Sequence, residues 1–470
     1  MNTHTPDSFQ AIVFDTDLIR RFDIHGPRYT SYPTADRFVE ACDGDIYADW
    51  LQRRGLRGGG AGRPLSLYVH IPFCNTVCYY CACNKIVTKD HGRSARYVDY
   101  LDKEMSMQAA ALSGPRNVVQ LHLGGGTPTF LAHDELRRLM ANIRRHFQLL
   151  PHGEFSIEVD PRNVGDDTVA LLAELGFNRM SVGVQDFDPA VQAAVNRMQS
   201  FEETAGVIAA ARRHRFRSIN VDLIYGLPRQ NILNFDQTLT RVIALSPERV
   251  SLYNYAHLPA LAKPQRRIDE RELPSPELKL QLFQEAIARL EAAGYVYIGM
   301  DHFAKPDDEL AIAQRQGRLH RNFQGYSIHA DADLMAFGVS AISNVGACYS
   351  QNHKTLDDYY DALDRNELPV MRGIELTPDD LLRRAIIQAL MCHFKLSIES
   401  IEIAHLIDFK RYFAAELDTL RDMAACGLLD IDAQWISVRP QGRLLVRAIA
   451  MVFDRYLRQE QERKRYSRII

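Results

Sequence analysis

Four cysteines lie within ten residues of one another, in the segment YVHIPFCNTVCYYCACNKI. Three residues separate Cys74 from Cys78, two separate Cys78 from Cys81, and Cys83 follows closely. Thiolates at this spacing on one loop can hold three corners of an iron–sulfur cube. Because a four-ligand cluster uses four cysteines, three ligands would leave one iron open to a further molecule. The pattern therefore predicts a metal or redox site with an open position.

Other uses of these cysteines fit the chain less well. A disulfide framework is typical of short secreted chains, whereas this one has 470 residues. Structural zinc stays an alternative, but it usually needs a second CxxC unit or two histidines, and His70 and His91 are not in HxxxH spacing. A redox CxxC motif opens a helix and needs no third thiol.

Short strand-like runs alternate with helical stretches from Leu65 to about Gly346. The expected strands are LSLYVHI, VVQLHL, FSIEV, RMSVGV, SINVDLI, RVSLYNY and YVYIGM. The expected helices are 95–112, 135–147, 167–175, 202–213, 235–244 and 277–293. This alternation predicts βαβ units and a parallel sheet, forming a barrel or an incomplete barrel, with a doubly wound sheet as the alternative. The cysteine loop follows the first strand, at the end where barrel enzymes place their chemistry.

The composition changes near Leu376. A helix is expected to open there with Thr377 as N-cap and Pro378 at its first position. Two strand-like runs, LLDID and WISVRP, and a helix over 442–457 follow. Helices with a small hairpin resemble a winged-helix domain, which often binds DNA but also serves as a structural cap or lid.

The overall composition is that of an ordinary globular protein. Hydrophobic residues make up 46% and charged residues 24%, and the net charge is −3, which disfavours nucleic-acid binding. No apolar run reaches the roughly 20 residues of a membrane span, and the first residues resemble no secretory or transit signal. We expect a cytoplasmic monomer that binds neither nucleic acid nor membrane.

The CxxxCxxC loop after a first barrel strand resembles the radical S-adenosylmethionine (SAM) superfamily. Further segments narrow this resemblance to the family of oxygen-independent coproporphyrinogen III oxidases (dehydrogenases). They are GPRYTSYPTA, the extended CxxxCxxCxC, GGGTPTF, IEVDPR, GVQDF, NR at 196–197, NVDLIYGLP, NYAHLP, GMDHFA, NFQGY and GVSAIS. The resemblance runs from about Ile24 to the C-terminus and rests on the ordered set of segments.

The resemblance implies an α/β fold with an incomplete (β/α)6-type radical SAM barrel, an N-terminal extension and a mostly helical C-terminal domain. The expected division is a substrate or lid segment at 1–62, a catalytic barrel at 63–375 and a C-terminal winged-helix-like domain at 376–470. The implied reaction turns two propionates of coproporphyrinogen III into vinyl groups without oxygen and yields protoporphyrinogen IX for haem synthesis. It uses a 4Fe-4S cluster, two SAM molecules, and an external electron donor such as flavodoxin or ferredoxin.

The resemblance also implies residue roles. Cys74, Cys78 and Cys81 would bind the cluster, and Cys83, Tyr68 and Glu158 would serve catalysis. The two SAM sites would be lined by Tyr68, Tyr80, Gly125, Gly126, Thr127, Glu158, Gln185, Arg197, Asp222, Ala256 and Ile342. Arg28 is a candidate substrate contact, because a guanidinium binds carboxylates well. Phe323 and Gln324, which lie near the cofactor in the family, are further candidates.

Two other functions remain as alternatives. A radical SAM paralogue that acts as a haem-binding chaperone would share the barrel segments, but typically lacks PRYTSYPTA and the fourth cysteine. A DNA-binding regulator with a redox-sensing cluster would use the C-terminal domain, which the near-neutral charge disfavours.

Overall fold

The computed structural model describes residues 12–54, 62–458, 466, 468 and 470. The chain divides into two compact units. The barrel unit consists of Asp36–Ser275 and Asp331–Glu375, and the second unit of the described parts of Met1–Ala35, Pro276–Ala330 and Leu376–Ile470. The division into functional segments at 1–62, 63–375 and 376–470 stays a prediction, and most of its glycine-rich stretch lies outside the described residues.

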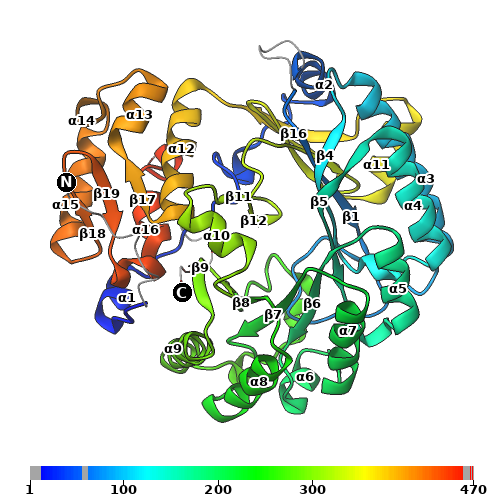
Figure 1. The fold of residues 1–470 in the computed structure, drawn as a ribbon, viewed down its shortest axis with the longest axis horizontal. Helices are drawn as coiled ribbons and strands as arrows, with labels where there is room; N and C mark the ends of the chain where they lie inside the picture. Colours follow the sequence, from blue (N-terminus) through cyan, green and yellow to red (C-terminus); the bar gives the residue numbers. More distant parts are fainter. Residues whose placement is uncertain (1–11, 55–61, 459–465, 467, 469) are drawn as a thin grey trace. The chain divides into compact units, whose positions relative to one another are not determined.

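The barrel unit is built on parallel strands that follow chain order. They are β1 (Leu65–Ile71), β4 (Asn117–Gly125), β5 (Gln148–Val159), β6 (Arg179–Gln185), β7 (Ser218–Tyr225) and β8 (Arg249–Asn254). Each pairs in parallel with the next. The connecting helices α3 (Gly92–Ala111), α4 (His133–His146), α5 (Asp166–Glu174), α7 (Phe201–Arg213) and α8 (Ile232–Leu245) cover one side of this sheet (Figure 1). The predicted incomplete barrel is confirmed.

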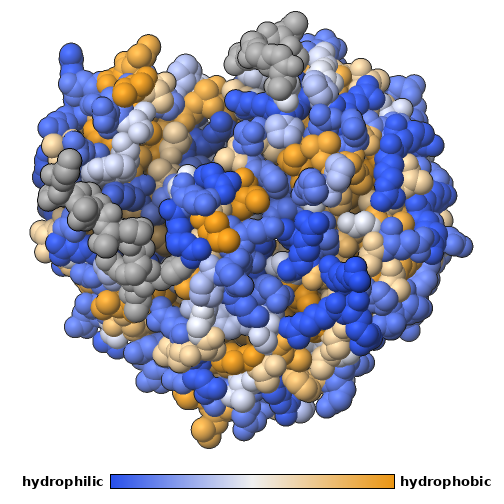
Figure 2. Space-filling view, viewed as in Figure 1, coloured by the Kyte–Doolittle hydropathy of each residue, from blue (hydrophilic) through white to orange (hydrophobic). Residues whose placement is uncertain are grey.

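The periodicity of each helix explains its packing. In α4, Leu136, Leu139, Met140 and Ile143 are buried, at the spacing that places apolar side chains on one helix face. Glu135 accepts a hydrogen bond from the Ala132 N–H at 2.8 Å and so caps the first turn. On the outside, hydrophilic residues dominate the surface seen in Figure 2, with apolar side chains in smaller groups.

An antiparallel extension continues the sheet beyond β1. Strand β13 (Asp333–Phe337) pairs in parallel with β1, and β14 (Ile342–Val345), β15 (Cys348–Asn352) and β16 (Val370–Glu375) follow in antiparallel order. Helix α11 (Leu356–Asp364) connects β15 to β16, and α2 (Gly44–Arg53) precedes β1. The sequence patterns had not predicted these strands. Every residue of β13 and β15 is buried, so neither strand shows the alternation that marks a half-buried strand.

The second unit begins with α1 (Thr16–Phe22) and continues with α9 (Pro276–Ala292). The expected barrel strand YVYIGM is instead β9 (Val296–Gly299), which forms an antiparallel pair with β10 (His302–Ala304). Helix α10 (Glu309–Arg315) leads to the hairpin β11 (His320–Asn322) and β12 (Gly325–Ser327). The predicted strand therefore forms, but it pairs in antiparallel order with β10 where parallel pairing was expected.

The C-terminal part of this unit is mostly helical. Its helices are α12 (Pro378–His393), α13 (Ile398–His405), α14 (Phe409–Tyr412) and α15 (Ala414–Ala425). The Thr377 side chain accepts from the Asp380 N–H, as the predicted N-cap requires. Both predicted strand runs form, as β18 (Leu429–Ile431) and β19 (Trp435–Val438), and β17 (Lys395–Ser397) completes the sheet.

The predicted continuous helix over 442–457 is wrong. The structure has a 3-10 helix, η7 (Pro440–Leu445), then α16 (Val446–Met451) and a separate α17 (Arg455–Arg458). The buried Asp454 carboxylate accepts from the backbone N–H groups of Tyr456 and Leu457 at 2.9 and 3.3 Å. An acidic side chain that caps a new first turn ends the preceding helix and starts another.

None of the helices in the described ranges combines the length and apolar character that a bilayer crossing requires.

Candidate active site

A row of polar side chains crosses the inner face of the parallel sheet. Strand register aligns Tyr68 with His122 and His122 with Ser156. The next level aligns Glu158 with Ser181 and Ser181 with Asn220, and a third level aligns Asp222 with Ser251. Hydrogen bonds link neighbours across the strands, as from Ser181 Oγ to Asp222 Oδ2 at 2.9 Å. These positions alternate with fully buried apolar ones, so the sequence period itself places them on one face.

The cysteine loop begins where β1 ends and is held at both sides. The strand β2 (Phe73–Cys74) pairs in parallel with β3 (Ile86–Val87). The Tyr79 N–H donates to the Val195 carbonyl at 2.9 Å, and the Asn196 amide donates to the Val77 carbonyl at 2.8 Å. A loop fixed in this way holds its side chains in place before any ligand binds.

Cys74, Cys78 and Cys81 line one pocket of about 80 Å³. Thr127 Oγ1 donates to the Cys74 sulfur at 3.5 Å, and the guanidinium groups of Arg162 and Arg197 donate to the Cys78 sulfur at 3.9 and 3.7 Å. Lys85 Nζ donates to the Cys81 carbonyl at 2.9 Å. Burial raises the pKa of Cys74 to about 11, whereas the hydrogen bond from Cys83 lowers the pKa of Cys81 to about 6.

These residues fit a cluster with three protein ligands. Among the described residues, no group of three or more His, Cys, Asp or Glu side chains is arranged to hold a metal ion. A cube binds each thiolate at a different iron, so its ligands surround the cluster and do not converge on one ion. Gly126 also lines this pocket, and a Cβ there would come within 2.7 Å of the Pro72 carbonyl oxygen.

The glycine turn after β4 is required by close packing. Gly125 has a φ of +115°, and a Cβ on it would lie 2.7 Å from the His70 ring. Its N–H donates to Glu158 Oε2 at 3.1 Å, so the turn also fixes this carboxylate. The Gly126 and Thr127 N–H groups donate to the Ile71 and Phe73 carbonyls at 2.8 and 2.9 Å. The turn therefore joins the polar row to the cysteine loop.

The structure brings Tyr68, Glu158 and Cys83 together. Burial raises the pKa of Tyr68, and the nearby charges of Glu158 and Cys83 raise this pKa further. His122 Nε2 lies 3.3 Å from Glu158 Oε1, and its ring stacks on Tyr68 at a centroid distance of 5.9 Å.

The other predicted site positions also lie on this side of the barrel unit. Burial raises the pKa of Asp222 to about 6, and the charge of Glu158 adds to the effect. Gln185 ends β6 with a φ of +68°, a strained conformation for a residue with a side chain. Arg197 is buried and donates to the Gly183 carbonyl at 2.7 Å. Ala256 follows β8, Ile342 opens β14, and Tyr80 lies between Cys78 and Cys81.

The three substrate candidates lie in the second unit. The Arg28 guanidinium forms an ion pair with Asp301, and its side chain keeps 34% of its surface exposed. Phe323 and Gln324 form the turn of the β11–β12 hairpin.

The PRYTSYPTA segment around Arg28 is fixed by residues near the C-terminus. Tyr29 Oη donates to Asp454 Oδ2 at 2.9 Å, and the Arg455 N–H donates to Tyr32 Oη at 3.2 Å. The Arg447 side chain donates to the Pro27 carbonyl at 3.1 Å. Both tyrosines are buried, so much of this segment packs inside its own unit.

Sequence reasoning missed the ion pairs behind the cysteines. Asp160 binds both Arg162 and Arg197, the latter at 3.2 Å. Burial alone would raise the pKa of Asp160, but the hydrogen bonds from Arg162 and the charge of Arg197 lower it below its ordinary value. Asp160 and Arg162 both lie in the segment IEVDPR. This segment could have indicated the pair, because an acidic and a basic residue directly after a strand lie at the reactive end of a barrel.

Comparisons with known proteins agree with this geometry. A family model described as the radical SAM superfamily matches residues 68–242, and one described as the HemN C-terminal domain matches residues 376–445. The oxygen-independent coproporphyrinogen III oxidase of Pseudomonas aeruginosa is 54% identical, over 98% of this chain and 99% of its own. That of Escherichia coli is 48% identical, over 98% and 100%.

A solved structure is similar across nearly the whole chain. It is the coproporphyrinogen III oxidase (HemN) of Escherichia coli, described as a radical SAM enzyme. The TM-score is 0.90 at 48% identity, and the match covers 95% of this chain and 100% of the other.

The incomplete barrel and its three-cysteine pocket, with these matches, define a radical SAM enzyme, which binds a 4Fe-4S cluster and SAM. Within that class, the chain belongs to the family of oxygen-independent coproporphyrinogen III oxidases.

Proposed function

We propose that this chain oxidatively decarboxylates two propionates of coproporphyrinogen III to vinyl groups without oxygen. The product is protoporphyrinogen IX, on the route to haem. The observation that carries the proposal is the pocket formed by Cys74, Cys78 and Cys81, with Cys83, Tyr68 and Glu158 grouped nearby. The similarity to named oxidases over nearly the full length supports it.

The three pocket cysteines hold the cluster in this proposal. When bound, the cluster and SAM supply the one-electron chemistry that removes a hydrogen atom from each propionate side chain. Arg162 and Arg197 donate to the Cys78 sulfur and offset its negative charge. Asp160 orients both guanidinium groups, so it acts as a positioning residue.

SAM binds along the polar row and the strand ends in this proposal. The lining residues are Tyr68, Tyr80, Gly125, Gly126, Thr127, Glu158, Gln185, Arg197, Asp222, Ala256 and Ile342. Carboxylates suit an amino group, so Glu158 and Asp222 complement the positively charged amino group of SAM.

Cys83 remains off the cluster in this proposal and holds a proton. The Cys83 thiol donates a hydrogen bond that lowers the pKa of Cys81, and the charge of Lys85 lowers this pKa further. The same bond raises the pKa of Cys83, which therefore keeps its proton beside Glu158. A protonated thiol at this place can give its proton within the site without becoming a ligand.

Arg28, Phe323 and Gln324 are the proposed substrate contacts. Arg28 already pairs with Asp301, so a propionate would share its guanidinium with that carboxylate. The enzyme works as a cytoplasmic monomer in this proposal, without nucleic acid or membrane. A flavodoxin or ferredoxin would supply electrons.

The direct test is anaerobic product analysis. The reconstituted protein is incubated with coproporphyrinogen III, SAM and dithionite, and the porphyrins are separated after oxidation. We expect protoporphyrin from the wild type and none from Cys78→Ala, which should also lose its iron and sulfide. A wild type that binds haem but forms no protoporphyrin would favour a haem chaperone and refute the proposal.

A further inference from the structure

The outer side of the cysteine loop is held by the 3-10 helix η5 (Lys263–Arg267). The Gln265 amide donates to the Tyr80 carbonyl at 2.9 Å. The Arg267 guanidinium lies over the Tyr79 ring at 5.4 Å from its centroid. Tyr79 and Tyr80 stand between Cys78 and Cys81, so η5 reaches within one residue of two proposed cluster ligands.

The η5 helix presents an unbalanced positive surface. Lys263, Arg266 and Arg267 are exposed, and within the described part of the chain none of them forms an ion pair. Two nearby carboxylates are paired with arginines, Asp269 with Arg271 and Glu272 with Arg229, and Glu270 contacts the ring of His257 at 3.1 Å. Leu261, just before η5, is 75% exposed. We call Leu261, Lys263, Arg266 and Arg267 the η5 surface.

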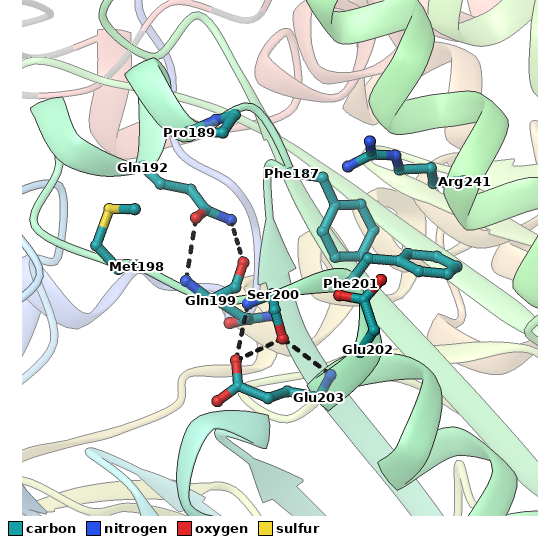
Figure 3. Close-up of a pocket in the computed structure, with 10 residues that line it drawn as sticks. All are labelled: Phe187, Pro189, Gln192, Met198, Gln199, Ser200, Phe201, Glu202, Glu203 and Arg241. Atoms are coloured by element: carbon teal, nitrogen blue, oxygen red, sulfur yellow. Dashed lines mark hydrogen bonds between the residues drawn. The ribbon is translucent and has the colours of Figure 1, made fainter.

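A second segment, around Asn196, also holds the cysteine loop and carries a different charge. There, Asn196 contacts Val77, and the chain continues into a hollow of about 540 Å³ (Figure 3). Figure 3 shows Glu202 and Glu203 at this hollow with Arg241. Glu203 accepts from the Ser200 N–H at 2.7 Å as part of a helix cap. Lys263, Arg266 and Arg267 give η5 three exposed cations, whereas Glu202 and Glu203 add negative charge at the hollow.

We propose that the η5 surface docks the acidic protein that delivers electrons to the cluster. This inference rests on the proposed function, in which electrons enter from an external one-electron carrier. In each delivery the carrier is oxidised by one electron and the cluster is reduced by one, and no bond in the chain forms or breaks. The carrier then leaves, because another electron is needed for the second propionate.

The chemistry of the surface fits such a partner. Unpaired cations attract an acidic protein over a distance, speed its association and orient it. An exposed leucine among them supplies the apolar contact that interfaces place within a polar rim. The carboxylates of the substrate are the other anions that this surface could bind, and the experiment separates the two.

The test compares two variants with equal changes of charge. Lys263→Glu with Arg266→Glu alters the η5 surface but spares Arg267, which contacts Tyr79. The control, Arg215→Glu with Arg217→Glu, alters exposed cations that precede β7. That is the opposite end of the parallel strands from the cysteine loop. Surface plasmon resonance measures binding of a flavodoxin, and turnover is followed with either reduced flavodoxin or dithionite as electron source.

We expect the η5 variant to bind flavodoxin about tenfold more weakly at low salt, with the difference shrinking as salt rises. Its flavodoxin-driven kcat/KM should fall by a similar factor. Its iron content, dithionite-driven turnover and KM for coproporphyrinogen III should match the wild type, and the control variant should match the wild type throughout.

Unchanged flavodoxin binding in the η5 variant would overturn the proposal. An equal loss with dithionite, or a raised KM for coproporphyrinogen III, would assign the surface to substrate binding and also overturn it. Failure of the proposed function would be a separate result. It would appear as a wild type that forms no product with dithionite, and the binding of flavodoxin would still test the η5 surface.

Discussion

Cys83 differs from its three neighbours in its partners. It is the exposed member of the loop cysteines, and its pKa is raised by the hydrogen bond to Cys81 and by the charge of Glu158, against the charge of Lys85. If it bound the cluster, no iron would stay open for SAM. We therefore expect Cys83→Ser to keep wild-type iron and sulfide but to lose turnover about 100-fold, the scale of a lost proton donor. Elemental analysis and product analysis check this, and a variant without its cluster would make Cys83 a ligand.

Arg162 offers a test of the charge behind the cluster. It donates to the Cys78 sulfur and binds Asp160. We expect Arg162→Gln to lower turnover about 10-fold, because groups that orient metal ligands have effects of this size. A chelator should also remove iron from the cluster of this variant faster than from the wild type. The control variant Arg144→Gln, on α4, should behave as the wild type. Normal chelator resistance in Arg162→Gln would limit Asp160 and Arg162 to packing.

At the scale of elements, Glu104 joins α3 to the antiparallel extension. Its carboxylate accepts from Gly338 N–H at 2.8 Å, from Asn352 at 2.7 Å and from Tyr359 Oη at 2.6 Å. Burial raises its pKa to about 7 from an ordinary value of 4.5, although these hydrogen bonds lower it. The side chain is therefore a buried acid that still titrates near neutral pH.

The sign of the resulting pH effect follows from the raised pKa. The folded protein holds the Glu104 proton more tightly than the unfolded chain, so this contribution to stability is fully present below about pH 4.5 and is lost as pH rises through about 7. We expect the melting temperature of the wild type, relative to Glu104→Gln, to fall from pH 6 to pH 8. A pH-independent difference would show that Glu104 does not titrate in this range.

The same scale shows what the sequence could predict. The parallel strands and the cysteine loop followed from apolar runs of strand length and from cysteine spacing, which are local signals. Strand β15 was not predicted, because its residues CYSQN include polar side chains that are nonetheless buried. The break before α17 was not predicted, because Asp454 caps this helix in a buried position where it also accepts a hydrogen bond from Tyr29. Long-range partners of this kind leave no periodic trace in the chain.

For the same reason, the motif positions of the site were predicted from the sequence but its ion pairs were not. Motif positions such as Tyr68 and Glu158 came from the resemblance, and strand register brings them together. Asp160 and Arg162 form their pair through the turn η4 (Pro161–Asn163), whose geometry no spacing rule predicts. The ion pair of Arg28 with Asp301 joins positions far apart in the chain, so the sequence could not predict it either.

At the scale of the molecule, the predicted site residues fall in two compact units. The proposed cluster and SAM residues lie in the barrel unit, whereas the buried Tyr29 bonds to Asp454 within the second. We expect Tyr29→Phe to destabilise the second unit by about 1–3 kcal/mol, because it leaves a buried carboxylate short of a donor. Thermal unfolding checks the loss, and iron and sulfide content should not change. Loss of the cluster in this variant would contradict the expectation that the Tyr29 hydrogen bond stabilises only its own unit.

The stoichiometry of SAM tests the central claim most directly. Under anaerobic conditions with dithionite, 5′-deoxyadenosine and protoporphyrinogen IX are counted in the same reaction. Two propionates each lose one hydrogen atom to this chemistry, so the account predicts two molecules of 5′-deoxyadenosine for each molecule of product. A ratio near one, or product formed without 5′-deoxyadenosine, would contradict it.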